Sequence, residues 1–193
     1  MYVAFEGVDT VGKSTQIERL AGRFEDCLVT KEPGGTPFGL RIRTMLLEEG
    51  AIHPRTEALL FLADRAEHIE RIIRPNRHRL ILSDRSLISG IAYAAVNEEI
   101  PMEELIALNR FATDGLYPDL AILFRIDRAT LARRLSQKMP DAIEQRGIAY
   151  MLRVQEAMER VIETLGIDAL FVDAGAPLES LTRQIETTIK ERL

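Results

Sequence analysis

The sequence has few of the features that would assign it to a special class of protein. It contains one cysteine, Cys27, in 193 residues, which excludes an internal disulfide and a cysteine-rich zinc site. We expect Cys27 to be a buried thiol. No apolar run approaches the roughly 20 residues that a membrane span needs, and no secretory signal pattern is visible. We therefore expect a cytoplasmic protein that does not bind membranes.

The sequence also has fewer basic than acidic residues. The chain has 25 Lys and Arg residues against 30 Asp and Glu residues, a net charge of -5. This balance argues against a protein that coats nucleic acid by charge alone, although it leaves room for a local basic pocket. The length, with 46% hydrophobic and 28% charged residues, is typical of one compact domain covering residues 1–193.

Short apolar runs alternate along the chain with segments of helical periodicity. We expect strands at 2–5, 28–30, 80–82, 120–126 and 170–172. We expect helices near 17–24, 39–49, 54–74, 86–96, 102–113, 129–138, 148–165 and 178–192. This alternation predicts an α/β fold of three layers, in which helices flank a five-stranded parallel sheet. The polar segment 136–147 has little periodicity and is the candidate for a short mobile flap.

A phosphate-binding loop follows the first expected strand and opens the first helix. It fits the pattern G-x-x-x-x-G-K-[ST] with the residues Gly7, Val8, Asp9, Thr10, Val11, Gly12, Lys13 and Ser14. Glycines allow backbone N–H groups to turn toward phosphate oxygens, and the helix directs its positive end at the same anion. Lys13 would reach the β- and γ-phosphates, and the Ser14 hydroxyl would hold Mg²⁺. The pattern predicts a P-loop NTPase-type fold with a nucleoside triphosphate site.

The loop alone does not name the reaction, because ATPases, GTPases and small-molecule kinases share it. The guanine-reading Asn-Lys-x-Asp pattern is absent from the sequence, which makes a GTPase less favoured. A kinase needs a second site for the group that accepts the phosphate.

Two pairs of residues are candidates for holding a second anion. Asp84 and Arg85 follow an expected strand, at the sheet edge where ligands bind in α/β folds. The acid there can hold Mg²⁺ and the arginine can clamp a phosphate, whereas the alternative is a surface ion pair. Arg41 and Arg43 follow a Gly-Gly loop, and they fit either a second anion site or a solvated helix face.

A third candidate lies on the long helix expected over 54–74. Phe61, Arg65 and His68 share one face, since steps of four and seven residues return to the same side. An aromatic ring beside a guanidinium offers a stacking platform and a donor for a base carbonyl. The alternative is that Phe61 belongs to the core and that Asp64 and Arg65 are solvated. The three histidines have no spacing for a metal site, and we expect them to be surface or packing residues.

These pieces together resemble the thymidylate kinases, P-loop enzymes that phosphorylate dTMP with ATP. The matching segments occur in the family's order over essentially the whole chain, and they are 5–15, 31–36, 60–65, 83–93 and 117–120. The combination of the loop Glu32-Pro33-Gly34-Gly35-Thr36 with this P-loop is far more specific than either alone.

The resemblance implies a role for each matched residue. It implies that Phe61 stacks on thymine, Arg65 hydrogen-bonds the base, and Tyr93 packs beneath the deoxyribose. The full dTMP site that it implies comprises Asp9, Pro33, Arg43, Phe61, Arg65, Arg85, Ser89, Gly90 and Tyr93. The implied ATP site comprises the P-loop residues 7–14, Thr15 and Arg134, which lies along the adenine. Ser14, Asp9 and Asp84 would hold Mg²⁺.

The resemblance also implies the residues that drive transfer and an assembly state. Lys13, Asp9 and Arg85 are expected to be catalytic. A basic residue from the P-loop or the flap assists transfer in this family. Thr10 occupies the P-loop position and Ala142 a flap position where relatives carry arginine, so we expect Lys138, or else Arg146, to supply the charge. Family members are usually homodimers, built here by parts of 40–48, 57–74 and 102–113.

The expected reaction is the transfer of the γ-phosphoryl group of ATP to dTMP, giving dTDP for dTTP synthesis. Two alternatives stay open: another small-molecule P-loop kinase, and a nucleotide-binding protein with weakened catalysis. Replacing Arg65 with Ala is expected to raise KM for dTMP and leave the fold intact. Cytosine would present an amino group to Arg65, a mismatch worth about 1–3 kcal/mol.

Overall fold

The computed structural model describes residues 1–47, 53–97, 100–136 and 147–193. Its centre is one sheet with strand order β2-β3-β1-β4-β5, and every neighbouring pair is parallel. The strands are β1 (Tyr2–Glu6), β2 (Cys27–Lys31), β3 (Leu80–Asp84), β4 (Leu120–Arg125) and β5 (Ala169–Asp173). All five predicted strands are therefore confirmed, with ends that differ by one or two residues.

The helices also follow the predicted order. They are α1 (Lys13–Ala21), α2 (Pro37–Leu47), α3 (Pro54–His68), α4 (Leu87–Ala95), α5 (Met102–Thr113), α6 (Arg128–Leu135), α7 (Ile148–Leu165) and α8 (Leu178–Lys190). The segment expected as one helix over 54–74 continues from α3 into a π-helical turn, η1 (Ile69–Ile73), and a 3₁₀ turn, η2 (Arg74–Asn76). Proline lacks the N–H that a regular helix would need there, which is why Pro75 occurs in the first turn of η2.

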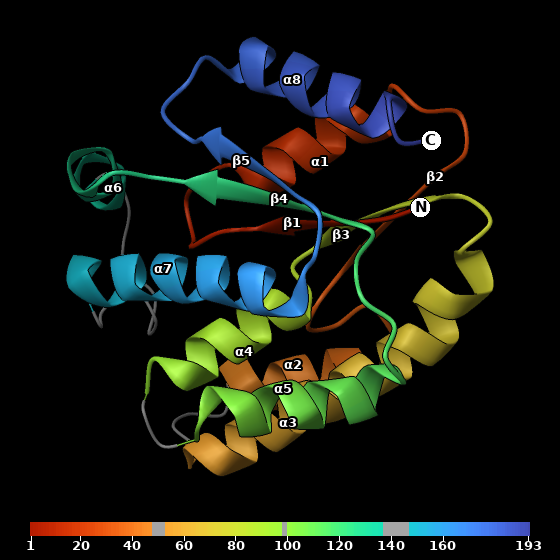
Figure 1. The fold of residues 1–193 in the computed structure, drawn as a ribbon, viewed down its shortest axis with the longest axis vertical. Helices are drawn as coiled ribbons and strands as arrows, with labels where there is room; N and C mark the ends of the chain where they lie inside the picture. The colour runs from red at the N-terminus through yellow and green to blue at the C-terminus, as the bar shows by residue number, and fades with distance from the viewer. Residues whose placement is uncertain (48–52, 98–99, 137–146) are drawn as a thin grey trace.

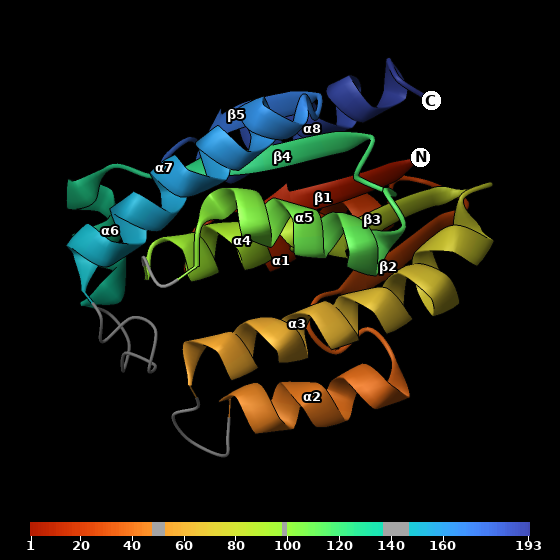
Figure 2. The ribbon, with the colours of Figure 1, turned by 60° about the horizontal axis from the view of Figure 1, so that its bottom comes forward.

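Helices cover both faces of the sheet, so the three-layer α/β prediction is confirmed. Figure 1 shows α1 and α8 on one face and α7, α4 and α5 on the other. Figure 2 shows α3 lying between α2 and the α4–α5 pair, with α2 outermost. Strands β1 and β4 are covered on both sides, and their apolar side chains are fully buried. No helix in the part of the chain that the structure describes is long and apolar enough to cross a membrane.

The parallel pairing brings three chain segments to one edge of the sheet. In the register of the ladders, Phe5 lies beside Asp84, and Asp84 lies beside Lys31. The loops that leave β1, β3 and β2 therefore begin next to one another. They are the P-loop, the Asp84-Arg85 turn and the loop that starts at Glu32, and this carboxyl edge is where α/β sheets bind ligands.

The prediction for Cys27 is wrong in degree. Cys27 begins β2, which is an edge strand, and its side chain is half-buried instead of buried. The burial that it has still raises the pKa of the thiol above its ordinary value.

The layered core predicts that a leucine-to-alanine substitution lowers the free energy of unfolding by different amounts at a buried and at an exposed position. Leu82 on β3 is fully buried, whereas Leu178 at the start of α8 is 45% exposed. We expect Leu82→Ala to lower the free energy of unfolding by about 2–5 kcal/mol, because it leaves a cavity between the sheet and its helices. Leu178→Ala is the matched control and is expected to cost under about 1 kcal/mol. Urea denaturation measures both, and equal losses would contradict this description of the core.

Candidate active site

The P-loop connects β1 to α1 and has the backbone shape of an anion cradle. Gly7, Thr10 and Gly12 have φ values of 141°, 69° and 97°. A Cβ atom on Gly7 would lie 3.0 Å from the Phe124 carbonyl oxygen, so glycine allows the loop to lie directly on β4. A positive φ at a threonine is uncommon and indicates a backbone that its surroundings hold in place.

Lys13 lies inside this loop. Its Nζ atom donates hydrogen bonds to the carbonyl oxygens of Gly7 and Val8, each at 3.0 Å. An ammonium has three N–H donors, so one remains for a phosphate oxygen. Burial, followed by the nearby Arg85, lowers the pKa of Lys13 to about 8. The positive charge is thus held in a site that favours its partnership with an anion.

Ser14 and Asp84 form the candidate metal site. The Ser14 hydroxyl donates to Asp84 Oδ2 at 2.9 Å, which places a neutral and a charged oxygen side by side. Mg²⁺ typically takes one or two protein oxygens, with water and substrate phosphates as its other ligands, so this pair fits Mg²⁺. Asp9, predicted as a third ligand, accepts a hydrogen bond from Arg85 Nη2 at 2.6 Å. No group of three or more His, Cys, Asp or Glu suited to a metal occurs among the described residues.

Arg85 joins the two halves of the site. Its φ is 74°, and the backbone is held by its N–H on the Phe5 carbonyl and by the Ser83 hydroxyl on its own carbonyl oxygen. The guanidinium donates to the Gly7 carbonyl and the Ser89 hydroxyl as well as to Asp9. Burial acts to lower the pKa of Arg85, but its surroundings, including the Asp9 carboxylate, hold the pKa above its ordinary value. Arg85 is therefore a permanent cation here.

Two adjoining cavities make one cleft. The phosphate cavity contains Lys13, Ser14, Thr15 and Lys31 in its wall, and the nucleoside cavity contains Pro33, Phe61, Arg65, Gly90 and Tyr93 in its wall. Both cavities are also lined by Asp9, Glu32, Arg43 and Arg85. The two arginines therefore stand where the cavities meet. Two anionic groups that face each other across this junction fit this distribution of charge.

The lining of the nucleoside cavity bears on two alternatives that the sequence left open. Phe61 is half-buried and lines the cavity, so it is not a core residue. Arg43 lines both cavities and donates to the Pro33 carbonyl at 3.1 Å, whereas Arg41 is exposed and lies over the Phe38 ring. The sequence offered no signal for Tyr150 of α7, which lines the cavity with its ring 6.5 Å from that of Tyr93.

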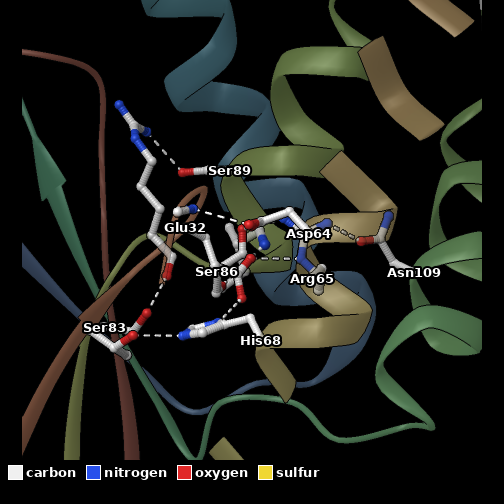
Figure 3. A network of polar contacts seen from close by, with 12 residues as sticks. Glu32, Asp64, Arg65, His68, Ser83, Ser86, Ser89 and Asn109 are labelled. Atoms are coloured by element: carbon white, nitrogen blue, oxygen red, sulfur yellow. Dashed lines mark hydrogen bonds and ion pairs between the residues drawn. The ribbon is translucent and has the colours of Figure 1, made fainter. Parts of the chain in front are cut away.

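Arg65 is deeper than the sequence suggested. It is 2% exposed, and it donates to Glu32 Oε2 at 2.8 Å, Asn109 Oδ1 at 2.5 Å and the Ser86 carbonyl at 3.2 Å. Figure 3 shows Arg65 and His68 reaching from one helix and Asn109 from another. Removing Arg65 would leave the buried Glu32 carboxylate with His68 as a partner but without its guanidinium, and breaking a buried ion pair in this way costs about 3–5 kcal/mol. The expectation that Arg65→Ala leaves the fold intact is therefore corrected.

The contact between Glu32 and His68, and that between Glu32 and Arg65, are what sequence reasoning missed. Glu32 is 4% exposed and His68 is fully buried. The sequence left open whether His68 is a surface or a packing residue, and the structure shows that it is a packing residue. Burial acts to raise the pKa of Glu32, but Arg65 and His68 together hold it below its ordinary value. The only available signal was that His68 follows Arg65 by one helical turn.

The remaining predicted residues have mixed outcomes. Arg134 lies against the P-loop, where it donates to the Thr10 carbonyl at 2.8 Å and to the Ala174 carbonyl at 2.6 Å. Ser89 lines the nucleoside cavity, but its hydroxyl is already engaged by Glu6 and Arg85. Lys138, Ala142 and Arg146 lie outside the described residues, as does most of the flap predicted over 136–147.

The fold and the cleft together define a P-loop nucleotide-binding protein of the kinase type, with a triphosphate loop that opens onto a nucleoside cavity. A family model described as thymidylate kinase matches residues 5–185. The chain belongs to the thymidylate kinase family.

Curated relatives match this chain over nearly their whole length. A protein of Sulfurovum sp. named thymidylate kinase is 48% identical over 190 residues, covering 98% of this chain and 100% of its own. Proteins of the same name from Sulfurimonas denitrificans and Campylobacter curvus are each 47% identical, covering 98% of this chain and 99% and 100% of theirs. The resemblance noted from the motifs is thus confirmed.

One buried acid behind the site yields a pH prediction. Glu6 is fully buried and accepts hydrogen bonds from the hydroxyls of Ser86, at 2.6 Å, and Ser89. Burial raises the pKa of Glu6 from 4.5 to about 7. Folding therefore favours its protonated form. The stability that this provides is fully present below pH 4.5 and is lost as the pH rises through about 7.

The variant Glu6→Gln removes this titration. The stability of the unaltered protein relative to Glu6→Gln is expected to fall by about 3 kcal/mol between pH 4.5 and pH 7.5. Urea unfolding across this range measures the difference. The control is Glu18→Gln at an exposed position of α1, for which we expect a flat profile. If the stability difference between the unaltered protein and Glu6→Gln is also independent of pH, Glu6 stays charged in the folded protein.

Proposed function

We propose that this chain transfers the γ-phosphoryl group of ATP to dTMP and releases ADP and dTDP, a step in dTTP synthesis. The observation that carries this proposal is the position of Arg43 and Arg85, which line both the triphosphate cavity and the nucleoside cavity. The acceptor phosphate would lie between these cations, facing the γ-phosphate held by the P-loop. The names of the relatives agree with this substrate.

In this arrangement the chain acts mainly by positioning two anions and neutralising their charge. Lys13 would donate its free N–H to a γ-phosphate oxygen, and the backbone N–H groups of the loop would hold the β-phosphate. The phosphate of dTMP is already ionised near neutral pH, so no strong general base is required. We propose that the predicted flap residue Lys138 adds a further positive charge.

Mg²⁺ is the proposed cofactor, which Ser14 and Asp84 would hold directly or through water. When bound, it neutralises charge on the β- and γ-phosphates. Asp9 is placed by its ion pair with Arg85, and we assign it mainly to orienting that guanidinium beside the acceptor phosphate. Arg134, fixed by two backbone carbonyls, offers a flat guanidinium for the adenine of ATP.

Base recognition would use the walls of the nucleoside cavity. The Phe61 ring provides a stacking surface and Tyr93 packs against the sugar. Three of the five N–H groups of Arg65 donate to protein acceptors, which leaves two for a base carbonyl. Thymine presents a carbonyl where cytosine presents an amino group, so dCMP would be rejected by unpaired donors.

Two neighbouring arginines test the position of the acceptor phosphate. Arg43→Ala is expected to raise KM for dTMP about tenfold to a hundredfold, because a charge-assisted hydrogen bond contributes about 1.5–3 kcal/mol. Arg41→Ala is the matched control and should change KM less than about twofold, since Arg41 does not line either cavity. A coupled assay of ADP release measures both.

The same assay, run with dTMP, dUMP, dCMP, AMP and GMP, separates the proposed reaction from another small-molecule kinase. Preference for an acceptor other than dTMP would contradict the substrate assignment. Single-turnover transfer from labelled ATP tests the binding-protein alternative, which predicts binding of both nucleotides without transfer.

We further propose that the protein is a homodimer. Six of the ten large apolar side chains that are exposed in the described residues lie on α2, α3 and α5, and they are Phe38, Leu40, Met45, Leu59, Leu108 and Phe111. These helices lie together on one side of the molecule (Figures 1 and 2). A grouped apolar surface of this kind is typical of an interface between subunits. The cytoplasmic location expected from the sequence stays a prediction.

The dimer predicts a large effect at its most exposed aromatic. Phe111 is 87% exposed, and Phe111→Glu is expected to raise the dissociation constant of the dimer at least about a hundredfold by burying a charge in the interface. Light scattering across a dilution series measures this. Leu193→Glu, at a 67% exposed residue outside the apolar group, is the control and should leave the mass unchanged. A monomer in the unaltered protein would refute the proposal.

A further inference from the structure

His68 makes a complete set of contacts inside the molecule. It is the last residue of α3 and is fully buried. Its Nδ1 atom lies 2.8 Å from Glu32 Oε1, and its Nε2 atom lies 2.7 Å from the Thr30 hydroxyl. A Cβ atom on Gly35 would lie 2.6 Å from His68 Cδ2, so the ring has almost no freedom to turn.

The contact with Glu32 has a defined direction. Arg65 and His68 outweigh burial and hold the pKa of Glu32 below its ordinary value, so Glu32 is a carboxylate and can only accept hydrogen bonds. The proton of this contact therefore lies on His68 Nδ1. The other oxygen of the Glu32 carboxylate, Oε2, accepts a hydrogen bond from Arg65 Nε at 2.8 Å. One carboxylate thus receives one hydrogen bond from each of two side chains, both on α3.

Arg65 is oriented from all sides by such contacts. Asn109 and the Ser86 carbonyl hold its two terminal nitrogens. A Cβ atom on Gly90 would lie 2.7 Å from Nη2 and 2.9 Å from Nη1, so the backbone of α4 lies against the guanidinium. Glu32 is the only one of these partners that carries a charge. Because Arg65 lines the nucleoside cavity, the position of Glu32 helps to set how the guanidinium is presented there.

We propose that His68 is a positioning residue for base recognition, which fixes Glu32 so that Arg65 presents its free N–H groups to the base. This proposal rests on the proposed dTMP kinase function. His68 acts through Glu32 and touches no substrate. The bond it supplies is charge-assisted, because an N–H donates to a buried carboxylate. Loss of the donor would let the carboxylate and the guanidinium shift, and the base would lose alignment before the phosphates do.

Two substitutions separate positioning from packing. The amide nitrogen of an asparagine lies near the place of histidine Nδ1, and that of a glutamine near the place of Nε2. His68→Gln is expected to raise KM for dTMP about tenfold and to reduce the preference for dTMP over dCMP about tenfold. Its kcat and its KM for ATP should stay within about threefold. His68→Asn keeps the donor to Glu32, and it should restore the preference to within about threefold of the unaltered protein.

The unaltered protein is assayed first, which separates the two hypotheses. Absence of dTMP turnover there would overturn the proposed function. With normal turnover, an unchanged preference in His68→Gln would overturn the role of His68. So would equal losses in both variants, or losses in kcat and KM for ATP as large as that in KM for dTMP, because these indicate packing alone.

A measurement on the unaltered protein tests the proposal even if a variant fails to fold. The chain contains three histidines, so nitrogen-15 NMR of labelled histidine resolves each ring. We expect His68 to carry a proton on Nδ1. This proton should exchange slowly with water, because the ring is buried and Nδ1 is hydrogen-bonded to the buried Glu32. An Nδ1 atom without a proton would overturn the proposal, since the donor to Glu32 would then not exist.

Discussion

The parallel pairing of β1, β2 and β3 is the constraint on which the rest of the site depends. Because the three strands end at the same edge, the P-loop, the Arg85 turn and the Glu32 loop leave the sheet side by side. Each loop carries one kind of chemistry: phosphate binding, an anion clamp and an acid that holds Arg65. None of the three would be useful alone, and the ladder hydrogen bonds of the sheet fix the distances between them.

Most of the charged side chains at this edge of the sheet have an ion-pair or hydrogen-bond partner in the protein. Arg85 is paired with Asp9, and Arg65 is paired with Glu32. Lys13 is held by two carbonyl oxygens, and Ser14 by Asp84. A buried cation or anion is costly unless it has such partners. The same pairing keeps the side chains in place before any ligand arrives, which lowers the cost of binding two nucleotides in register.

The net charge of -5 hid this arrangement. It is an average over the whole surface, and it describes neither the phosphate cavity nor the junction lined by Arg43 and Arg85. Composition thus argued against a protein that coats nucleic acid by charge alone, and it said nothing about a cleft for small phosphate esters.

The sequence by itself determined the order of the elements, the P-loop and the family. These follow from short-range patterns: apolar periodicity gives the strands and helices, and Gly12, Lys13 and Ser14 must be neighbours to cradle phosphate. Periodicity could not separate Arg43 from Arg41 or show whether Phe61 faces the core, because it gives the face of a helix but not what lies opposite. Tertiary structure alone decided the cluster of contacts around Arg65 and Glu32. Glu32, Ser86, His68 and Asn109 are distant from one another in the chain, and only the packing of α3 against the sheet edge, α4 and α5 brings them together.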